Sequence, residues 1–250
     1  EPQQEQQPIE ILFTTTHLEA FVPNYPTPGR TYDGVEQRES QMKQMTTFCD
    51  TYLSKHRNIV AAFVTGDLNW DDERPRSKGV DKTLLDLLNG GDGGIGRVKE
   101  TNKKQGFSIR SNSHHPWIDA WKINQGKKSE GYTYDSKINP MLRGNLRRRF
   151  DRILIRENCY DSEEKQESAS STASSYASSS SLRIKSTDMF GMEPIHGLEW
   201  KKEVIPWGRP YGASSSPSIQ IRPVLPSDHY GLWAVMDYSS MSSASSSSKV

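Results

Sequence analysis

Two oxygen-bearing side chains follow directly after an apolar run, in the tetrapeptide Gly66-Asp67-Leu68-Asn69. The run covers residues 59–64 and has the length and β-rich composition of a buried strand, and the glycine at its end lets the backbone turn. If strand geometry continues, the Asp67 carboxylate and the Asn69 carboxamide face the same way. Such oxygen donors suit a divalent cation, the water that attacks a phosphate, or both.

Further polar groups stand at or just inside other predicted strands: His17, Asp151 and the pair Asp228-His229. Each alone is compatible with a surface histidine, a turn or an ion pair, because short motifs often match by chance. Together with Asp67 they fit one reaction. One carboxylate orients a water, an amide holds the phosphate, a histidine stabilises the developing oxyanion, and a second carboxylate fixes the histidine tautomer. A divalent metal would neutralise the phosphoryl oxygens.

The elements that must position these groups are strands and helices without a strict βαβ alternation. Hydrophobic patterning predicts helices over residues 34–54 and 81–88, and strands over residues 9–16, 59–64, 117–121, 132–134, 150–155, 182–186 and 230–238. This mixture indicates an α+β fold of stacked sheets with helices outside. The strand at 230–238 is apolar on both faces, so we expect it to be central and covered on both sides.

The composition of the chain sets its domain limits. Its 250 residues suffice for one domain over residues 9–238, and serine-rich segments at 162–181 and 239–250 are expected to be disordered, as is the polar segment 1–8. The two cysteines are too few for a disulfide scaffold or a zinc site, so a reducing compartment, nucleus or cytoplasm, is expected. No stretch has the length of a membrane span.

The net charge of +1 gives no general attraction to nucleic acid or membrane. Five arginines nevertheless crowd into residues 143–152. Such a cluster predicts either a phosphate-contacting patch or a solvated basic strand entry, and the sequence leaves these two open.

Four motifs together resemble the endonuclease/exonuclease/phosphatase superfamily. In chain order they are Thr-His-Leu-Glu at 16–19, Gly-Asp-Leu-Asn at 66–69, Phe-Asp-Arg-Ile at 150–153 and Ser-Asp-His-Tyr-Gly-Leu at 227–232. The resemblance implies a four-layer stacked β-sandwich flanked by helices, in which the N-terminal part of the domain is missing from these 250 residues. Motifs such as Asp-Ala-Trp at 119–121 and Tyr-Thr-Tyr-Asp at 132–135 are most similar to the tyrosyl-DNA phosphodiesterase 2 subgroup.

That resemblance implies hydrolysis of the bond between a tyrosine and a DNA 5′ phosphate, with Mg²⁺ or Mn²⁺ as cofactor. A monomer that acts on DNA carrying a 5′ protein or phosphotyrosyl adduct is expected. The implied catalytic residues are Asp67 for the water, Asn69 and His17 for the phosphate, His229 for the transition state and Asp151 as its orienting partner. Asp228 would support the metal, and the implied substrate-binding residues are Trp70, Tyr134 and Arg149.

Three departures from the family pattern shape these expectations. The family's principal metal-binding glutamate has no counterpart before His17, so we expect weak or no activity from these residues alone. Tyr134 stands where the subgroup has tryptophan, and Asp71-Asp72 follows Trp70 where it has a basic residue, so two carboxylates would repel a DNA backbone. The alternatives are a superfamily nuclease or phosphatase for RNA, phosphoinositides or similar esters, and a truncated or inactive half domain that only binds.

Overall fold

The fold is taken from a computed structural model of the chain. It describes residues 9–23, 31–32, 34–56, 58–73, 83–89, 115–125, 128–142, 144–158, 180–204 and 218–240. The predicted segment 1–8 and nearly all of the two serine-rich segments lie outside these residues.

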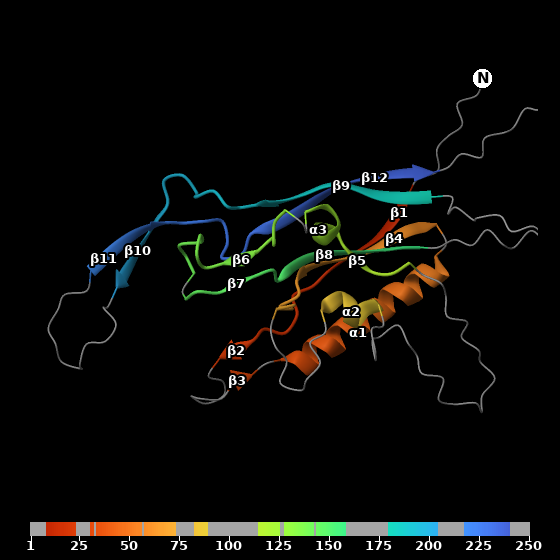
Figure 1. The fold of residues 1–250 in the computed structure, drawn as a ribbon, viewed down its shortest axis with the longest axis horizontal. Coiled ribbons are helices and arrows are strands. Elements are labelled where there is room, and N and C mark those ends of the chain that lie inside the picture. The colour runs from red at the N-terminus through yellow and green to blue at the C-terminus, as the bar shows by residue number, and fades with distance from the viewer. Residues whose placement is uncertain are drawn as a thin grey trace, which may run out of the picture.

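A four-stranded sheet with the order β1-β4-β8-β5 forms the centre of the fold. Its strands are β1 (Glu10–Thr15), β4 (Ile59–Asp67), β8 (Asp151–Glu157) and β5 (Ile118–Asp119). β1 runs parallel to β4, whereas β8 and β5 are antiparallel to their neighbours (Figure 1). The register pairs Asp67 with Asp151, so two predicted site carboxylates meet at one end of adjacent strands.

Helices cover one face of this sheet. These are α1 (Val35–Lys55) and the short α2 (Leu84–Asn89), both beneath the sheet in Figure 1. Buried residues of α1 recur at helical spacing, and the predicted packing role of Cys49 is confirmed because its side chain is fully buried. The core on this face includes Met42, Cys49, Leu53, Ala62, Val64, Leu68, Trp70, Leu84, Trp117 and Leu154.

A second, two-stranded sheet covers the other face. β9 (Ser180–Phe190) pairs antiparallel with β12 (Gly231–Ser240), and α3 (Ala120–Asn124) lies beside them. This core contains Ala61, Phe63, Ala120 and Ile155, with Leu182, Ile184, Ala234 and Met236 packed against it. The predicted α+β class with stacked sheets and outer helices is confirmed, and the described residues form three layers, helix on sheet on sheet.

The prediction that the last strand is central and covered on both sides is wrong. Among the described residues β12 pairs with β9 alone, and the side chains of Trp233 and Val235 on its outer face are 41% and 42% exposed. Apolar residues on both faces of a strand therefore did not indicate burial on both faces here. Both strands also extend two residues into the segments predicted to be disordered, because backbone pairing continues through Ser180–Ser240 and Ser181–Ser239.

The remaining strands form three small ribbons. They are β2 (Val22–Pro23) with β3 (Thr31–Tyr32), β6 (Tyr134–Asp135) with β7 (Arg147–Arg148), and β10 (Glu199–Val204) with β11 (Ser218–Pro223). The sequence did not predict β10 or β11, which project away from the layered body (Figure 1). The predicted strand at 117–121 is half strand and half helix, since Asp119 caps α3. In the part of the chain that the structure describes, no helix is long and apolar enough to cross a membrane.

Gly66 makes the close approach of β1 and β4 possible where both strands end. Its φ is 119°, and a Cβ there would lie 2.0 Å from the carbonyl oxygen of Thr16. We predict that Gly66→Ala lowers the free energy of unfolding by about 3 kcal/mol, from backbone strain and this clash together. Urea unfolding measures it. The matched control is Gly144→Ala, since Gly144 has φ 92° and nothing within 4 Å of its Cβ position, and equal losses in the two variants would contradict the role of the clash.

Candidate active site

An acidic and histidine cluster stands at the end of the central sheet. The His229 Nδ1 atom lies 2.8 Å from Asp151 Oδ2 and 3.8 Å from Asp67 Oδ2. One ligand atom from each of these three residues lies within 4.8 Å of the others, close enough to hold a metal ion. The two carboxylates come from paired positions of β4 and β8, and the histidine comes from the loop before β12. The structure therefore brings together three groups that are far apart in the sequence, from 78 positions between Asp151 and His229 to 162 positions between Asp67 and His229.

Burial and charge change the protonation of this cluster. Burial raises the pKa of Asp67 above its usual value, and the Asp151 charge adds to this, whereas the Asn69 N–H opposes it. Burial lowers the pKa of His229, but the hydrogen bond and the charge of Asp151 outweigh it, so the net pKa is raised. His229 is therefore more readily protonated than a free imidazole, and Asp151 fixes its Nδ1 as the donor.

Asn69 and His17 flank Asp67 from two sides. β4 ends at Asp67, so Asn69 does not continue the strand, and it adopts the left-handed region with φ 45°. Its N–H donates to Asp67 Oδ1 at 2.8 Å and its side-chain Nδ2 donates to the Leu18 carbonyl at 3.0 Å. The His17 imidazole is 72% exposed, with Nε2 3.4 Å from Asp67 Oδ2. A turn, rather than the extended strand considered from the sequence, sets the relation of Asp67 to Asn69.

Tyr134 and Asp228 lie at the rim of the cluster. The Tyr134 ring meets the His229 ring edge-on with centroids 5.2 Å apart, and it also contacts Phe150. Asp228 is exposed, and its carboxylate accepts a hydrogen bond from the Ser227 hydroxyl at 3.3 Å. It is not a member of the three-residue group that could hold a metal, and its predicted metal role stays a prediction.

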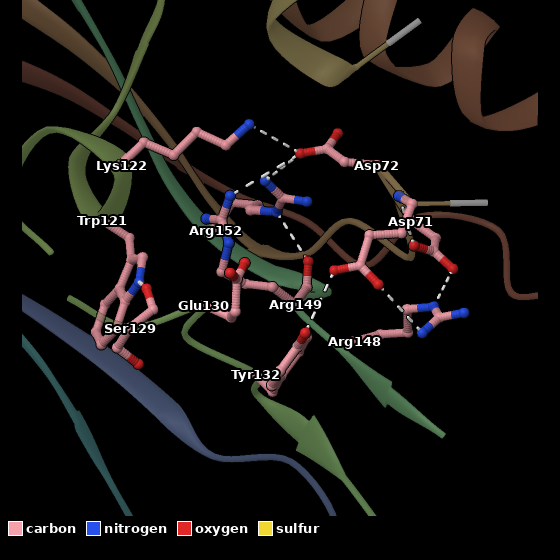
Figure 2. A pocket seen from close by; sticks show the side chains of 11 residues that line it. Asp71, Asp72, Trp121, Lys122, Ser129, Glu130, Tyr132, Arg148, Arg149 and Arg152 are labelled. Carbon is pink, nitrogen blue, oxygen red and sulfur yellow. Dashed lines mark hydrogen bonds and ion pairs between the residues drawn. The ribbon is translucent and has the colours of Figure 1, made fainter. Parts of the chain in front are cut away.

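Two predicted substrate-binding residues are buried instead. Trp70 is 1% exposed and belongs to the core under the helices. The Arg149 side chain is 7% exposed, and its guanidinium donates to Asp119 at 2.7 Å. Both side chains are thus used inside the fold, although Arg149 also lines the cavity shown in Figure 2, and their substrate-binding roles stay predictions. Aromatic and basic residues near a candidate site are equally suited to core packing and buried ion pairs, and sequence alone does not separate these uses.

A buried ion-pair network holds the loop that follows Asn69 in place. The sequence did not predict this network. The Asp119 carboxylate accepts hydrogen bonds from Arg149 and Arg152 and also from the N–H of Trp121 at the start of α3. Arg152 reaches further, to Asp72 at 3.1 Å and to the Trp70 carbonyl at 3.2 Å. The sequence signal for it was the arginine-rich run at residues 143–152, for which the sequence offered a phosphate-contacting patch and a solvated basic strand entry as open alternatives.

The same network neutralises the carboxylates that were expected to repel a DNA backbone. Asp71 forms an ion pair with Arg148, and Asp72 pairs with Arg152 and Lys122 (Figure 2). These residues line a cavity with Tyr132 and Glu130, and none of Asp67, Asp151 and His229 lines it. Burial raises the pKa of Asp72, but Arg152, the Leu84 N–H and Lys122 outweigh this and lower it to about 2. The expected repulsion therefore loses its physical basis.

Among known proteins, the chain is similar to part of several solved structures that share one name. No protein-family model and no curated protein matches it. It is similar to a truncated TDP2 of Caenorhabditis elegans, with 16% identity and a TM-score of 0.39 over 90% of this chain and 52% of that chain. A second C. elegans TDP2 structure shows 16% identity and a TM-score of 0.45, with 90% and 41% covered. D. rerio TDP2 complexed with single-strand DNA product shows 17% identity and a TM-score of 0.41, with 90% and 55% covered. The chain thus spans about half the length of these structures.

We predict that the Asp72 network stabilises the fold at neutral pH and loses this effect in acid. Because the pKa of Asp72 is about 2 in the folded chain and its ordinary value is 3.8, the unfolded chain takes up the proton first as pH falls. The contribution, about 2 kcal/mol, is present above pH 4 and is lost between pH 4 and 2. Asp72→Asn should therefore lower the free energy of unfolding at pH 7 and flatten its fall below pH 4, as measured by urea unfolding.

Asp237→Asn is the control for Asp72→Asn. Asp237 pairs with Lys185 at 2.6 Å, but both side chains are more than half exposed, so its loss should change stability by less than about 1 kcal/mol. An Asp72 variant with the same small loss would show that the network contributes nothing beyond a surface pair.

Proposed function

We propose that this chain carries part of the active site of a divalent-metal-dependent phosphodiesterase that acts on DNA ends, with 5′-tyrosyl-DNA adducts as substrate. The observation that carries the proposal is the group formed by Asp67, Asp151 and His229 at one end of the central sheet. A carboxylate–imidazole pair 2.8 Å apart beside a second carboxylate is suited to activating water and stabilising charge on phosphorus. The four family motifs in the same order support the phosphoester class.

The donor set fits a divalent cation. The carboxylates of Asp67 and Asp151 belong to a group whose ligand atoms lie within 4.8 Å of one another, and they match the oxygen donors that Mg²⁺ or Mn²⁺ prefers. Asp67 and Asp151 would hold the ion, because His229 donates from Nδ1 to Asp151 and in its protonated form has no lone pair for a metal. When bound, it would supply Lewis-acid stabilisation of charge on the phosphoryl oxygens.

The residues of this chain have distinct tasks in the proposed hydrolysis. Asp67 accepts a hydrogen bond from the attacking water and orients it toward phosphorus. His229 donates to a phosphoryl oxygen as charge develops there, and Asp151 keeps its ring oriented and stabilises its protonated form, in line with the raised pKa of His229. Asn69 and His17, on either side of Asp67, contact the phosphate.

Recognition of nucleic acid is assigned to Tyr134. Its ring lies against His229 at the rim of the cluster, where a base of a single strand could stack on it. The pairing of Asp71 and Asp72 with basic residues supports the approach of a polyanion, because these two carboxylates are neutralised. Location in the nucleus or cytoplasm is proposed with this function.

Hydrolysis tests the catalytic roles. We predict slow, metal-dependent release of tyrosine from a 5′-phosphotyrosyl oligonucleotide by the chain, which Asp67→Ala and His229→Ala each abolish because water orientation and charge stabilisation are lost. Product release is measured by gel or chromatography in Mg²⁺ and in Mn²⁺. Asp237→Ala and His196→Ala, at exposed positions outside the cluster, are the controls and should keep the wild-type rate.

The outcomes of this assay separate the alternatives. Full activity in Asp67→Ala or His229→Ala refutes the assigned roles. Oligonucleotide binding without turnover in either metal favours a non-catalytic half domain that only binds. Faster cleavage of RNA into shorter fragments, or faster release of phosphate from a phosphoinositide headgroup, would assign the site to another superfamily substrate.

The substrate class depends on Tyr134. We predict that Tyr134→Ala weakens the binding of a single-stranded oligonucleotide about 5- to 100-fold, because base stacking on an aromatic ring contributes roughly 1–3 kcal/mol. Tyr134→Phe keeps the ring and should bind as the wild type does. Fluorescence anisotropy gives both dissociation constants. Equal affinity of the wild type and Tyr134→Ala would exclude stacking at this rim and favour a substrate without bases.

A further inference from the structure

We propose that Asn139 is a positioning residue that holds His229 against Asp151. Asn139 touches neither of these side chains, and it acts on the backbone of the loop that carries the histidine. The inference deepens the proposed function and rests on it for its catalytic consequence, whereas its structural consequence can be measured separately.

The Asn139 side chain is completely buried and its amide is used on both ends. Its Nδ2 donates to the carbonyl oxygens of Ser227 at 3.2 Å and Asp228 at 3.1 Å, which are the two residues directly before His229. Its Oδ1 accepts from the Met141 N–H at 3.0 Å. A buried amide that spends both N–H donors on consecutive carbonyls fixes the orientation of the peptide unit between them.

Residues 226–228 of this loop are held by hydrogen bonds rather than by side-chain packing. Their side chains are exposed, and the first buried neighbours are Leu225 and Tyr230. Besides the Asn139 contacts, the hydrogen bonds include that from the His229 N–H to Ser227 Oγ at 3.1 Å, that from the Ser227 hydroxyl to Asp228 at 3.3 Å and that from the Tyr230 N–H to the Thr133 carbonyl at 2.8 Å. The His229 ring itself also contacts the rings of Tyr134 and Phe150.

The segment at residues 133–139 also fixes Asp151, the hydrogen-bond partner of His229. The buried Thr133 hydroxyl accepts from the backbone N–H groups of Phe150 and Asp151, both at 3.1 Å, and so ties the start of β8 to residue 133. Asn139 is tied back to this turn, because its N–H donates to the Asp135 carbonyl at 2.9 Å. One short segment, residues 133–139, therefore contacts the backbone on both sides of the His229–Asp151 hydrogen bond.

This arrangement makes the 2.8 Å contact between His229 and Asp151 depend on Asn139, which lies outside both β8 and the loop that carries His229. A shift of about 1 Å in the loop would break a hydrogen bond of that length, and misplacement on this scale is known to cost enzymes about 100-fold in rate. Asn139→Ala removes both donors, but residues 227 and 228 are exposed, so water can reach this loop in the variant. The fold can therefore survive a change that the histidine geometry does not.

The decisive measurement is the NMR signal of the His229 Nδ1 proton in ¹⁵N-histidine-labelled, metal-free protein. A proton held between imidazole and carboxylate gives a far-downfield signal correlated with the ring nitrogen. We expect this signal in the wild type and its loss in Asn139→Ala, with the cooperative thermal transition retained. Asn124→Ala is the matched control, since Asn124 joins the Lys185 carbonyl and the Thr187 N–H in another part of the fold, and it should keep the signal. A normal His229 signal in folded Asn139→Ala overturns the proposal.

A second measurement avoids any folding defect of the variant. In the wild type, both Asn139 side-chain amide protons should exchange with D₂O at least 10-fold more slowly than those of the exposed Asn145. Equal exchange rates would overturn the proposal, because the two carbonyl contacts would then not persist in solution.

A measurement of kcat and KM distinguishes this inference from the proposed function. If the chain hydrolyses a phosphotyrosyl oligonucleotide, Asn139→Ala should lower kcat about 10- to 100-fold and leave KM within about 2-fold, because the substrate does not contact Asn139. If no phosphoester is hydrolysed, the proposed function fails while the NMR results still decide the role of Asn139. Unchanged kcat with a lost His229 signal would overturn its catalytic consequence.

Discussion

The buried carboxylate of Asp119 is the group on which the arrangement around the site depends. Its side chain has no exposed surface, and it accepts hydrogen bonds from two arginines and from the first turn of α3. Burial raises the pKa of Asp119, but Arg149 and Arg152 outweigh this and lower it, so the group stays ionised. An ionised carboxylate at this depth is tolerated only because these donors surround it, and removal of one partner of such a pair costs roughly 3–5 kcal/mol.

This constraint reaches the site through Arg152. The arginine lies on β8 directly after Asp151, so its side chain points away from the cluster while its neighbour points into it. It binds Asp119 on one side and Asp72 and the Trp70 carbonyl on the other. The loop after Asn69 is thereby attached to β8 and α3 together. Charge pairs of the loop, and not apolar packing alone, therefore stabilise the turn that places Asn69 beside Asp67.

A second constraint is the pairing of β4 with β8. Antiparallel register places Asp67 opposite Asp151, and burial together with the Asp151 charge raises the pKa of Asp67. The His229 imidazole between them offsets this effect, and a bound cation would offset it further. The apolar side chains on either face of the sheet hold these strands in place, so Asp67 and Asp151 lie at the end of a packed element, whereas His229 lies on the loop before β12.

The sequence by itself determined the elements and the candidate reacting groups. Apolar runs and helical spacing located β1, β4, β8 and α1, and the polar residues at the ends of these elements included all three members of the cluster. These signals are local, because hydrophobic periodicity and strand-end polarity are properties of neighbouring residues. Tertiary structure decided what each polar or aromatic residue does. Trp70 and Arg149 became buried, and β12 became an outer strand, because burial depends on which distant segments pack together. The hydrogen bond from Arg149 to Asp119 joins residues 30 positions apart and that from Asn139 to the Asp228 carbonyl joins residues 89 positions apart, and no local pattern in the chain encodes either of them.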